Sequence, residues 1–111
     1  KSGNTFLRKR LLGWADQYIA RLQSGEVVSF RPRGNSMQGR VESGQLVTLE
    51  PPTHPVKKGC VVLCKVGGAQ YLHLVVAVGA DGRYQIGNNK GRINGWCTPS
   101  QVYGILIKVE N

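Results

Sequence analysis

The amino-acid sequence predicts a mostly-β domain with one amino-terminal helix. Apolar residues repeat with helical spacing near the amino terminus, and beyond Gly25 they alternate in short runs separated by turn residues. A chain of 111 residues suits one domain with one core, and a hydrophobic content of 41% excludes a wholly disordered chain. We therefore expect a single domain over residues 1–111, with a helix at 5–24 and a β domain at 27–109.

The helical pattern runs over residues 5–23 and places its apolar side chains on one face. These are Leu7, Leu11, Trp14, Tyr18 and Leu22. Ser24-Gly25 ends the pattern, because glycine often follows the last helical residue. The apolar face is expected to dock on a sheet. A dimer contact and a lost membrane anchor are the alternatives.

Six or seven short strands should follow the helix. Alternating or apolar runs lie at 27–31, 45–50, 60–66, 71–78, 83–86 and 101–109. Gly67-Gly68 and Asp81-Gly82 are hairpin signals, and the Gly- and Asn-rich stretch 87–94 is expected to be a loop. Closure of the sheet into a barrel is favoured, since it would remove exposed strand edges. Trp96 is expected to fill part of the core.

The net charge of +9 attracts nucleic acid, acidic proteins or anionic lipid. One basic group surrounds Ser36 and comprises Arg31, Arg33 and Arg40. No nucleic-acid-binding motif accompanies it, so nucleic acid is only a weakly supported partner and a solvated basic surface is the simpler expectation.

The cysteines, the apolar runs and the histidines limit the other classes of site. Cys60, Cys64 and Cys97 lack the spacing of a zinc knuckle and are expected to be free thiols, which suits a reducing cytoplasm. No apolar run approaches the ~20 residues that a bilayer span needs, so no membrane span is expected. His54, between prolines in an expected surface loop, is too far from His73 to predict a metal site. No cofactor is expected.

Ser36 is the first candidate for chemistry, because it lies in the turn Gly34-Asn35-Ser36-Met37. A nucleophilic serine needs an exposed hydroxyl on a tightly turned backbone, and neighbouring N–H groups that are free to hold an oxyanion. Gly34 and Gly39 give the backbone this freedom. Taken alone, the segment is a turn that contains a serine.

Four ordered segments of the chain resemble motifs of the signal-peptidase and LexA-type serine peptidase superfamily. They are residues 34–47, 56–62, 71–75, and 86–91 with the closing stretch 102–106. The resemblance covers about residues 27–109, and the four motifs in order are more specific than any one of them. It implies a β-ribbon barrel with one amino-terminal helix, and a peptidase with Ser36 as nucleophile and with Gly34, Asn35 and Met37 shaping its turn.

His73 matches the general base of the Ser/His branch of that superfamily. Alternation places Tyr71, His73 and Val75 on one face of an expected strand, where a lone histidine is most often a core residue. A neutral imidazole with a pKa near ~6.5 can accept the serine proton at neutral pH. The branch has an aspartate in its late motif, whereas this chain has Asn88-Asn89, the candidate groups for orienting the ring.

Two functions from different classes follow. The retained Ser36 and His73 favour a serine endopeptidase that cleaves its own chain or a partner's. Gln45, Cys60 and Asn89, which stand where the superfamily has acidic residues, favour a catalytically silent module that binds a protein or nucleic acid through its basic surface. A third hypothesis, a small phage-type regulator that contacts DNA, rests on charge alone.

Overall fold

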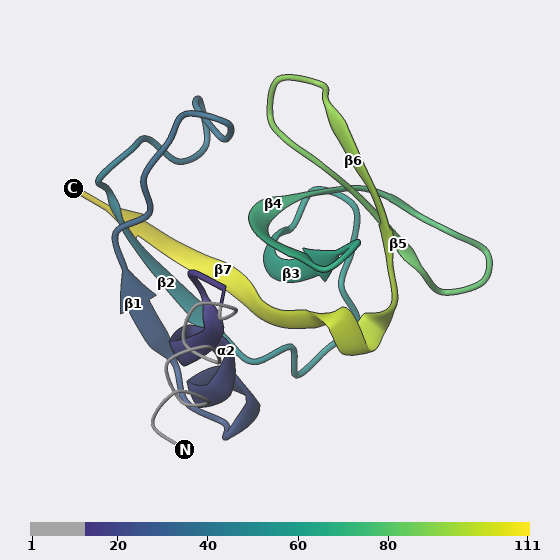
Figure 1. Cartoon of the computed structure of the whole chain (residues 1–111), viewed down its shortest axis with the longest axis horizontal. Coiled ribbons are helices and arrows are strands. Elements are labelled where there is room, and N and C mark those ends of the chain that lie inside the picture. Colours follow the sequence, from purple (N-terminus) through teal and green to yellow (C-terminus); the bar gives the residue numbers. More distant parts are fainter. Residues whose placement is uncertain (1–12) are drawn as a thin grey trace, which may run out of the picture.

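The structure, a computed structural model, describes residues 13–111 and consists of one antiparallel sheet with a short helix beside it (Figure 1). Residues 5–12 of the expected helix, with Leu7 and Leu11, lie outside the described residues. The elements in chain order are α2 (Asp16–Gln23), β1 (Val28–Phe30), β2 (Leu46–Glu50), β3 (Val61–Val66), β4 (Ala69–Val78), β5 (Tyr84–Gly87), β6 (Ile93–Cys97), the 3-10 turn η1 (Pro99–Gln101) and β7 (Val102–Glu110).

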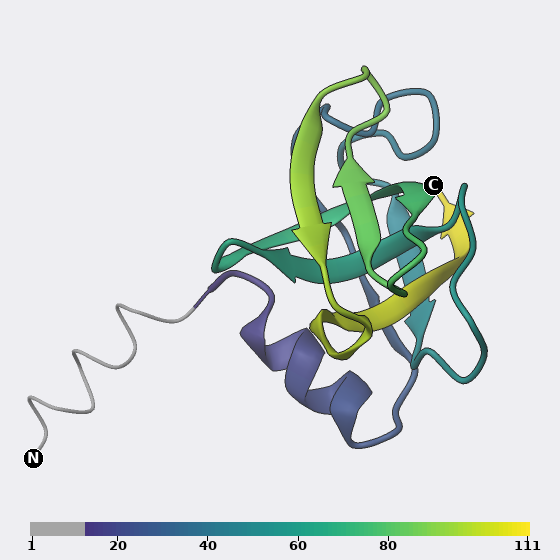
Figure 2. The same ribbon diagram turned by 90° about the vertical axis from the view of Figure 1, so that its right-hand side faces the viewer.

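The seven strands are arranged in the order β1-β2-β7-β3-β4-β5-β6. The last strand, β7, therefore lies in the middle of the sheet, where it pairs with β2 on one side and β3 on the other. Figure 2 shows the β5–β6 hairpin standing above the strongly twisted β3–β4 pair. The prediction of a mostly-β fold with one helix is confirmed.

The expected closure into a barrel is wrong, because the sheet of the described residues is open and β1 and β6 form its two ends. β1 has only three residues, so it leaves little unpaired edge that closure would need to protect. The other end curls over the sheet instead of pairing with β1. A Cβ atom on Gly95 of β6 would lie 3.0 Å from Val66 Cγ1 of β3.

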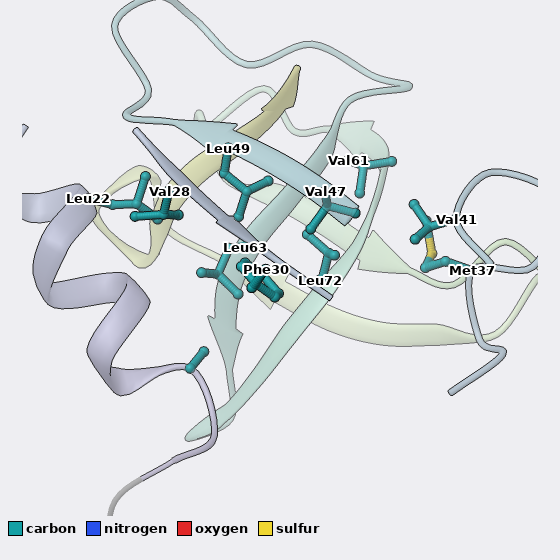
Figure 3. Packing of buried hydrophobic residues seen from close by; sticks show 11 residues of the cluster. Leu22, Val28, Phe30, Met37, Val41, Val47, Leu49, Val61, Leu63 and Leu72 are labelled. Atoms are coloured by element: carbon teal, nitrogen blue, oxygen red, sulfur yellow. The ribbon is translucent and has the colours of Figure 1, made fainter. Parts of the chain in front are cut away.

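Strand β3 divides the core into two clusters because both of its faces are buried. Val61 and Leu63 face the first cluster, with β1, β2 and α2, whereas Val62 and Cys64 face the second, with β5 and β6. Figure 3 shows the first cluster, in which Leu22 of α2 points toward β1. One sheet thus supplies both halves of the core.

Helix α2 is held at both ends by the sheet. At its start, the Gln70 side chain of β4 accepts the Ala15 N–H at 2.8 Å and donates to Asp16. Near its other end, Leu22 packs so tightly on β7 that a Cβ atom on Gly104 would lie 2.8 Å from Leu22 Cδ1. The absence of a side chain at Gly104 therefore allows the helix to approach the sheet.

The structure differs from the sequence-based expectations in two further elements. Residues 93–97, partly expected to be loop, form β6, which pairs with β5. Trp96 does not fill the core; it is 41% exposed and lies beneath the Arg83 guanidinium, 5.8 Å from the ring centre. Among residues 13–111, no helix is both long and apolar enough to cross a membrane.

Candidate active site

The loop between β1 and β2 carries Ser36 and is anchored by its own side chains. Met37 and Val41 are buried, 5% and 4% exposed, and lie together at the edge of the first core cluster (Figure 3). Gly34 and Gly39 have φ values of 106° and 99°, which a residue with a side chain adopts only at a cost in free energy. Burial of Met37 fixes the backbone beside Ser36.

A second loop, between β5 and β6, forms hydrogen bonds with the loop that carries Ser36. The Asn89 N–H donates to Ser36 O at 3.0 Å, and Asn89 Nδ2 donates to Gln38 O at 2.8 Å. Arg40 Nε donates in turn to Asn89 Oδ1 at 2.8 Å. Asn89 thus donates two hydrogen bonds to the serine loop and accepts a third from it, and one of them holds the Ser36 backbone directly.

His73 lies on β4 and faces Ser36, with Ser36 Oγ 3.0 Å from His73 Nε2. The ring is only 8% exposed and stacks on Tyr71 with 4.8 Å between ring centres. The alternation that predicted a common face for Tyr71 and His73 is therefore the arrangement in the structure. The two residues proposed for catalysis lie within hydrogen-bonding distance of each other.

The other ring nitrogen of His73 contacts Asn94, which the sequence did not single out. His73 Nδ1 lies 2.7 Å from Asn94 Oδ1. In the β5–β6 pairing, Ile86 faces Gly95 and Gly87 faces Ile93, so Asn94 is the extra residue of a bulge. Bulges redirect side chains at the ends of sheets, and this one turns the Asn94 amide toward β4.

Asn88 and Asn89, the candidates for orienting the ring, make other contacts. Asn88 Oδ1 accepts the N–H groups of Lys90 and Arg92 at 2.8 and 2.9 Å, which shapes the β5–β6 loop. Asn89 holds the serine loop instead. No regular pattern in the sequence indicates Asn94, because Gly95 interrupts the alternation of the Ile-Asn-Gly-Trp-Cys segment.

Hydrogen bonding and burial together define the protonation state of His73. Asn94 Oδ1 is an acceptor, so Nδ1 carries the proton and Nε2 is free to accept the Ser36 hydroxyl proton. Burial lowers the pKa of His73, and the hydrogen bond that its Nδ1–H donates to Asn94 opposes this effect in part. The neutral imidazole, which is the form that acts as a base, therefore predominates at neutral pH.

An open pocket of about 770 Å³ lies over these residues. Ser36, His73 and Asn94 line it together with aromatic and basic side chains, namely Trp14, Tyr18, Phe30, Arg31, Arg33 and Arg92. Within residues 13–111, the N–H groups of Asn35, Ser36 and Met37 donate to no backbone carbonyl. The pocket therefore combines a hydroxyl and an imidazole, and the backbone of the Ser36 turn beside them has N–H groups without a backbone acceptor among the described residues.

The other residues weighed for function lie apart from this pocket. His54 is exposed, with Nδ1 3.5 Å from Thr53 Oγ1. Cys60, Cys64 and Cys97 are free thiols, and a hydrogen bond with Cys97, together with burial, raises the pKa of Cys64. In the part of the chain that the structure describes, no three His, Cys, Asp or Glu residues are grouped so that they could hold a metal ion.

Asn94, His73 and Ser36 form a continuous hydrogen-bonded chain that ends on a hydroxyl facing the pocket. Comparisons with protein-family models, with curated proteins and with solved structures found no match. Chemically, a chain of this kind suits removal of the serine proton during attack on a carbonyl carbon.

Proposed function

We propose that this protein is a serine endopeptidase in which Ser36 is the nucleophile and His73 the general base. The single observation that carries the proposal is the 3.0 Å contact between Ser36 Oγ and His73 Nε2, with the far side of the ring held by Asn94. The resemblance of the sequence to the signal-peptidase and LexA-type superfamily points to the same pair. It also implies that the substrate is an extended peptide.

In the proposed reaction, Ser36 Oγ attacks the carbonyl carbon of the scissile peptide bond while its proton passes to His73 Nε2. The imidazolium then donates that proton to the leaving amine, and an acyl-serine ester remains. Water, deprotonated by His73, then attacks the ester carbon; the bond to Ser36 Oγ breaks, His73 returns the proton to Oγ, and the carboxylic acid product leaves. A positioned base of this kind typically contributes about 10²–10⁴-fold to the rate.

The backbone around Ser36 supports stabilisation of the tetrahedral intermediate. The N–H groups of Asn35, Ser36 and Met37 donate to no backbone carbonyl of residues 13–111, so they are available to an oxyanion. Loss of a single such donor commonly costs about 10²–10³-fold in kcat. The hydrogen bond from the Asn89 N–H to Ser36 O holds these backbone N–H groups in position before substrate binds.

The test is covalent labelling with a fluorophosphonate probe, followed by mass spectrometry of the modified peptide. We expect stoichiometric labelling at Ser36, and its loss in Ser36→Ala and His73→Ala. Ser29→Ala is the matched control, because Ser29 Oγ bonds Thr48 Oγ1 at 2.9 Å and lies outside the pocket lining. Labelling that persists in Ser36→Ala would remove the proposal.

A second candidate function is a binding module that uses the same pocket without cleavage. It is favoured by the nature of the third residue, since Asn94 presents a neutral amide and stabilises an imidazolium less than a carboxylate would. Such a module would bind its partner equally well with Ser36→Ala and would show no Ser36 labelling. A cytoplasmic location is proposed for either function, because the three free thiols suit a reducing compartment.

A further inference from the structure

The charged side chains around the pocket are unevenly balanced. Three arginines, Arg31, Arg33 and Arg92, line it with a single acidic residue, Glu42. Two of these four are already bonded to the loop, because Glu42 Oε2 accepts the Gly39 N–H at 2.8 Å and Arg31 Nη1 donates to Gly44 O at 2.8 Å. Arg33 and Arg92 are the cations left for a ligand.

Arg33 and Arg92 are exposed, and neither takes part in an ion pair within residues 13–111. They come from two of the three segments that build the site. Arg33 precedes the Ser36 turn, and Arg92 precedes Asn94 where the β5–β6 loop enters β6. Two guanidinium groups that line the same pocket as Ser36 attract a carboxylate, which can accept paired hydrogen bonds from a guanidinium.

The aromatic lining favours a peptide over a nucleic acid as the source of the negative charge. Tyr18 stacks on Phe30 with 4.2 Å between ring centres, and Trp14 meets Phe30 edge-on at 5.9 Å. Rings that pack on one another offer apolar walls for a side chain. Single-stranded nucleic acid needs ring faces that stack on bases, and the Tyr18–Phe30 stack covers one face of each of these rings, although Trp14 remains 51% exposed.

We infer that the pocket recognises a peptide bearing an Asp or Glu side chain beside the residue held at Ser36, through Arg33 and Arg92. This inference rests on the proposed function in placing the peptide across Ser36. The acid would lie in the rim of the pocket, where partial exposure limits each contact. Loss of one arginine is therefore expected to weaken binding about threefold to fivefold.

The test measures binding without turnover, using the full chain with Ser36→Ala. Two fluorescent dodecapeptide libraries are compared by anisotropy at about 50 mM salt, where screening is weak. They are identical except for a central Asp in one and Asn in the other. We expect the Asp library to bind more tightly, and the preference to vanish in Arg33→Gln/Arg92→Gln.

Lys58→Gln is the matched control, because Lys58 is an exposed cation outside the pocket lining. It should keep the preference for Asp. Equal binding of the two libraries, or an equal loss of preference in Lys58→Gln, would overturn the inference, since bulk attraction to a basic protein would then explain the data. Tighter binding of oligothymidine that depends on Arg33 and Arg92 would overturn it as well.

Reversal of the charge at both arginines should create a new binding preference, which a misfolded variant could not show. Arg33→Glu/Arg92→Glu should prefer a library with a central Lys over the Asp library, and failure to reverse would count against direct contact. The binding preference and the labelling of Ser36 are measured independently, so the two proposals can fail separately. A preference for Asp without any labelling of Ser36 would support the inference and reject the peptidase, whereas labelling without the preference would do the opposite.

Discussion

Asn94 Oδ1 lies 2.7 Å from His73 Nδ1, on the side of the imidazole opposite Ser36. The amide oxygen sets the tautomer as a carboxylate would, but it adds no negative charge. The ring is therefore oriented toward Ser36, while the imidazolium of the proposed reaction would receive only dipolar stabilisation. This combination makes the residue at position 94 the most informative one to change.

Replacement of Asn94 by Asp should increase kcat for peptide cleavage and raise the pKa of His73, because a carboxylate stabilises the imidazolium. Asn94→Ala should lower kcat by about 10²-fold, since the ring loses its orienting partner. Both are measured by steady-state kinetics on a fluorogenic peptide. Asn111→Asp adds the same charge beside Gln45, away from the pocket, and should leave kcat unchanged.

The activity should depend on pH through His73. Burial lowers the pKa of His73, so kcat/KM should rise with pH and level off with a midpoint below the ordinary value of about 6.5. His54→Gln leaves a single histidine, whose titration by NMR should give the same midpoint. A midpoint above about 6.5 in either measurement would contradict this assignment.

The lowered pKa of His73 should also make the free energy of unfolding depend on pH. The unfolded chain binds a proton at His73 more readily than the folded chain, so stability should fall as pH drops from about 6.5 toward the lowered pKa. The loss should be smaller in His73→Gln, which cannot titrate. Urea unfolding across this pH range measures the difference.

Gly87→Ala should reduce peptidase activity because it displaces the backbone that positions Asn94. A Cβ atom on Gly87 would lie 2.7 Å from Arg92 O and 3.2 Å from Ile93 Cδ1, so the backbone leading to the bulge must move. We expect a lower kcat and a loss of stability of about 1–3 kcal/mol, measured by kinetics and urea unfolding. In an Asn94→Ala background the effect on kcat should largely disappear; fully additive effects would argue against this route.

Gly104→Ala should loosen the contact between α2 and β7. The new Cβ atom would lie 2.8 Å from Leu22 Cδ1, and overpacking of this kind costs about 1–3 kcal/mol of unfolding free energy. Leu22→Ala alone should cost about 2–5 kcal/mol. In the double variant the Gly104→Ala penalty should vanish, because the clashing atoms are gone. Urea unfolding of all four proteins gives the coupling, and additivity would contradict the contact.

The sequence allowed prediction of the strands whose apolar pattern is regular, and of the pairing between Ser36 and His73 through a resemblance in motif order. His73 could be found because β4 alternates regularly around it. Asn94 could not, because its direction depends on a one-residue shift in the β5–β6 register, and register is a property of two strands rather than of one segment.

Trp96 and the open sheet were mispredicted for related reasons. Large apolar residues are usually buried, but Trp96 lies on β6, an edge strand of the sheet, and its ring packs against Arg83 instead of the core. Closure into a barrel was expected because it would remove exposed strand edges. The shortness of β1, which makes closure unnecessary, becomes visible only in the three residue pairs of its register.

The central place of β7 affects when the site is assembled during synthesis. The strand leaves the ribosome after every other element, yet it is the one that joins β2, which follows the Ser36 loop, to β3, whose hairpin partner carries His73. Until β7 is inserted, serine and histidine belong to two halves of a sheet with no strand between them. The contact between Ser36 and His73 is therefore expected to form only after the last-synthesised strand has joined the two halves.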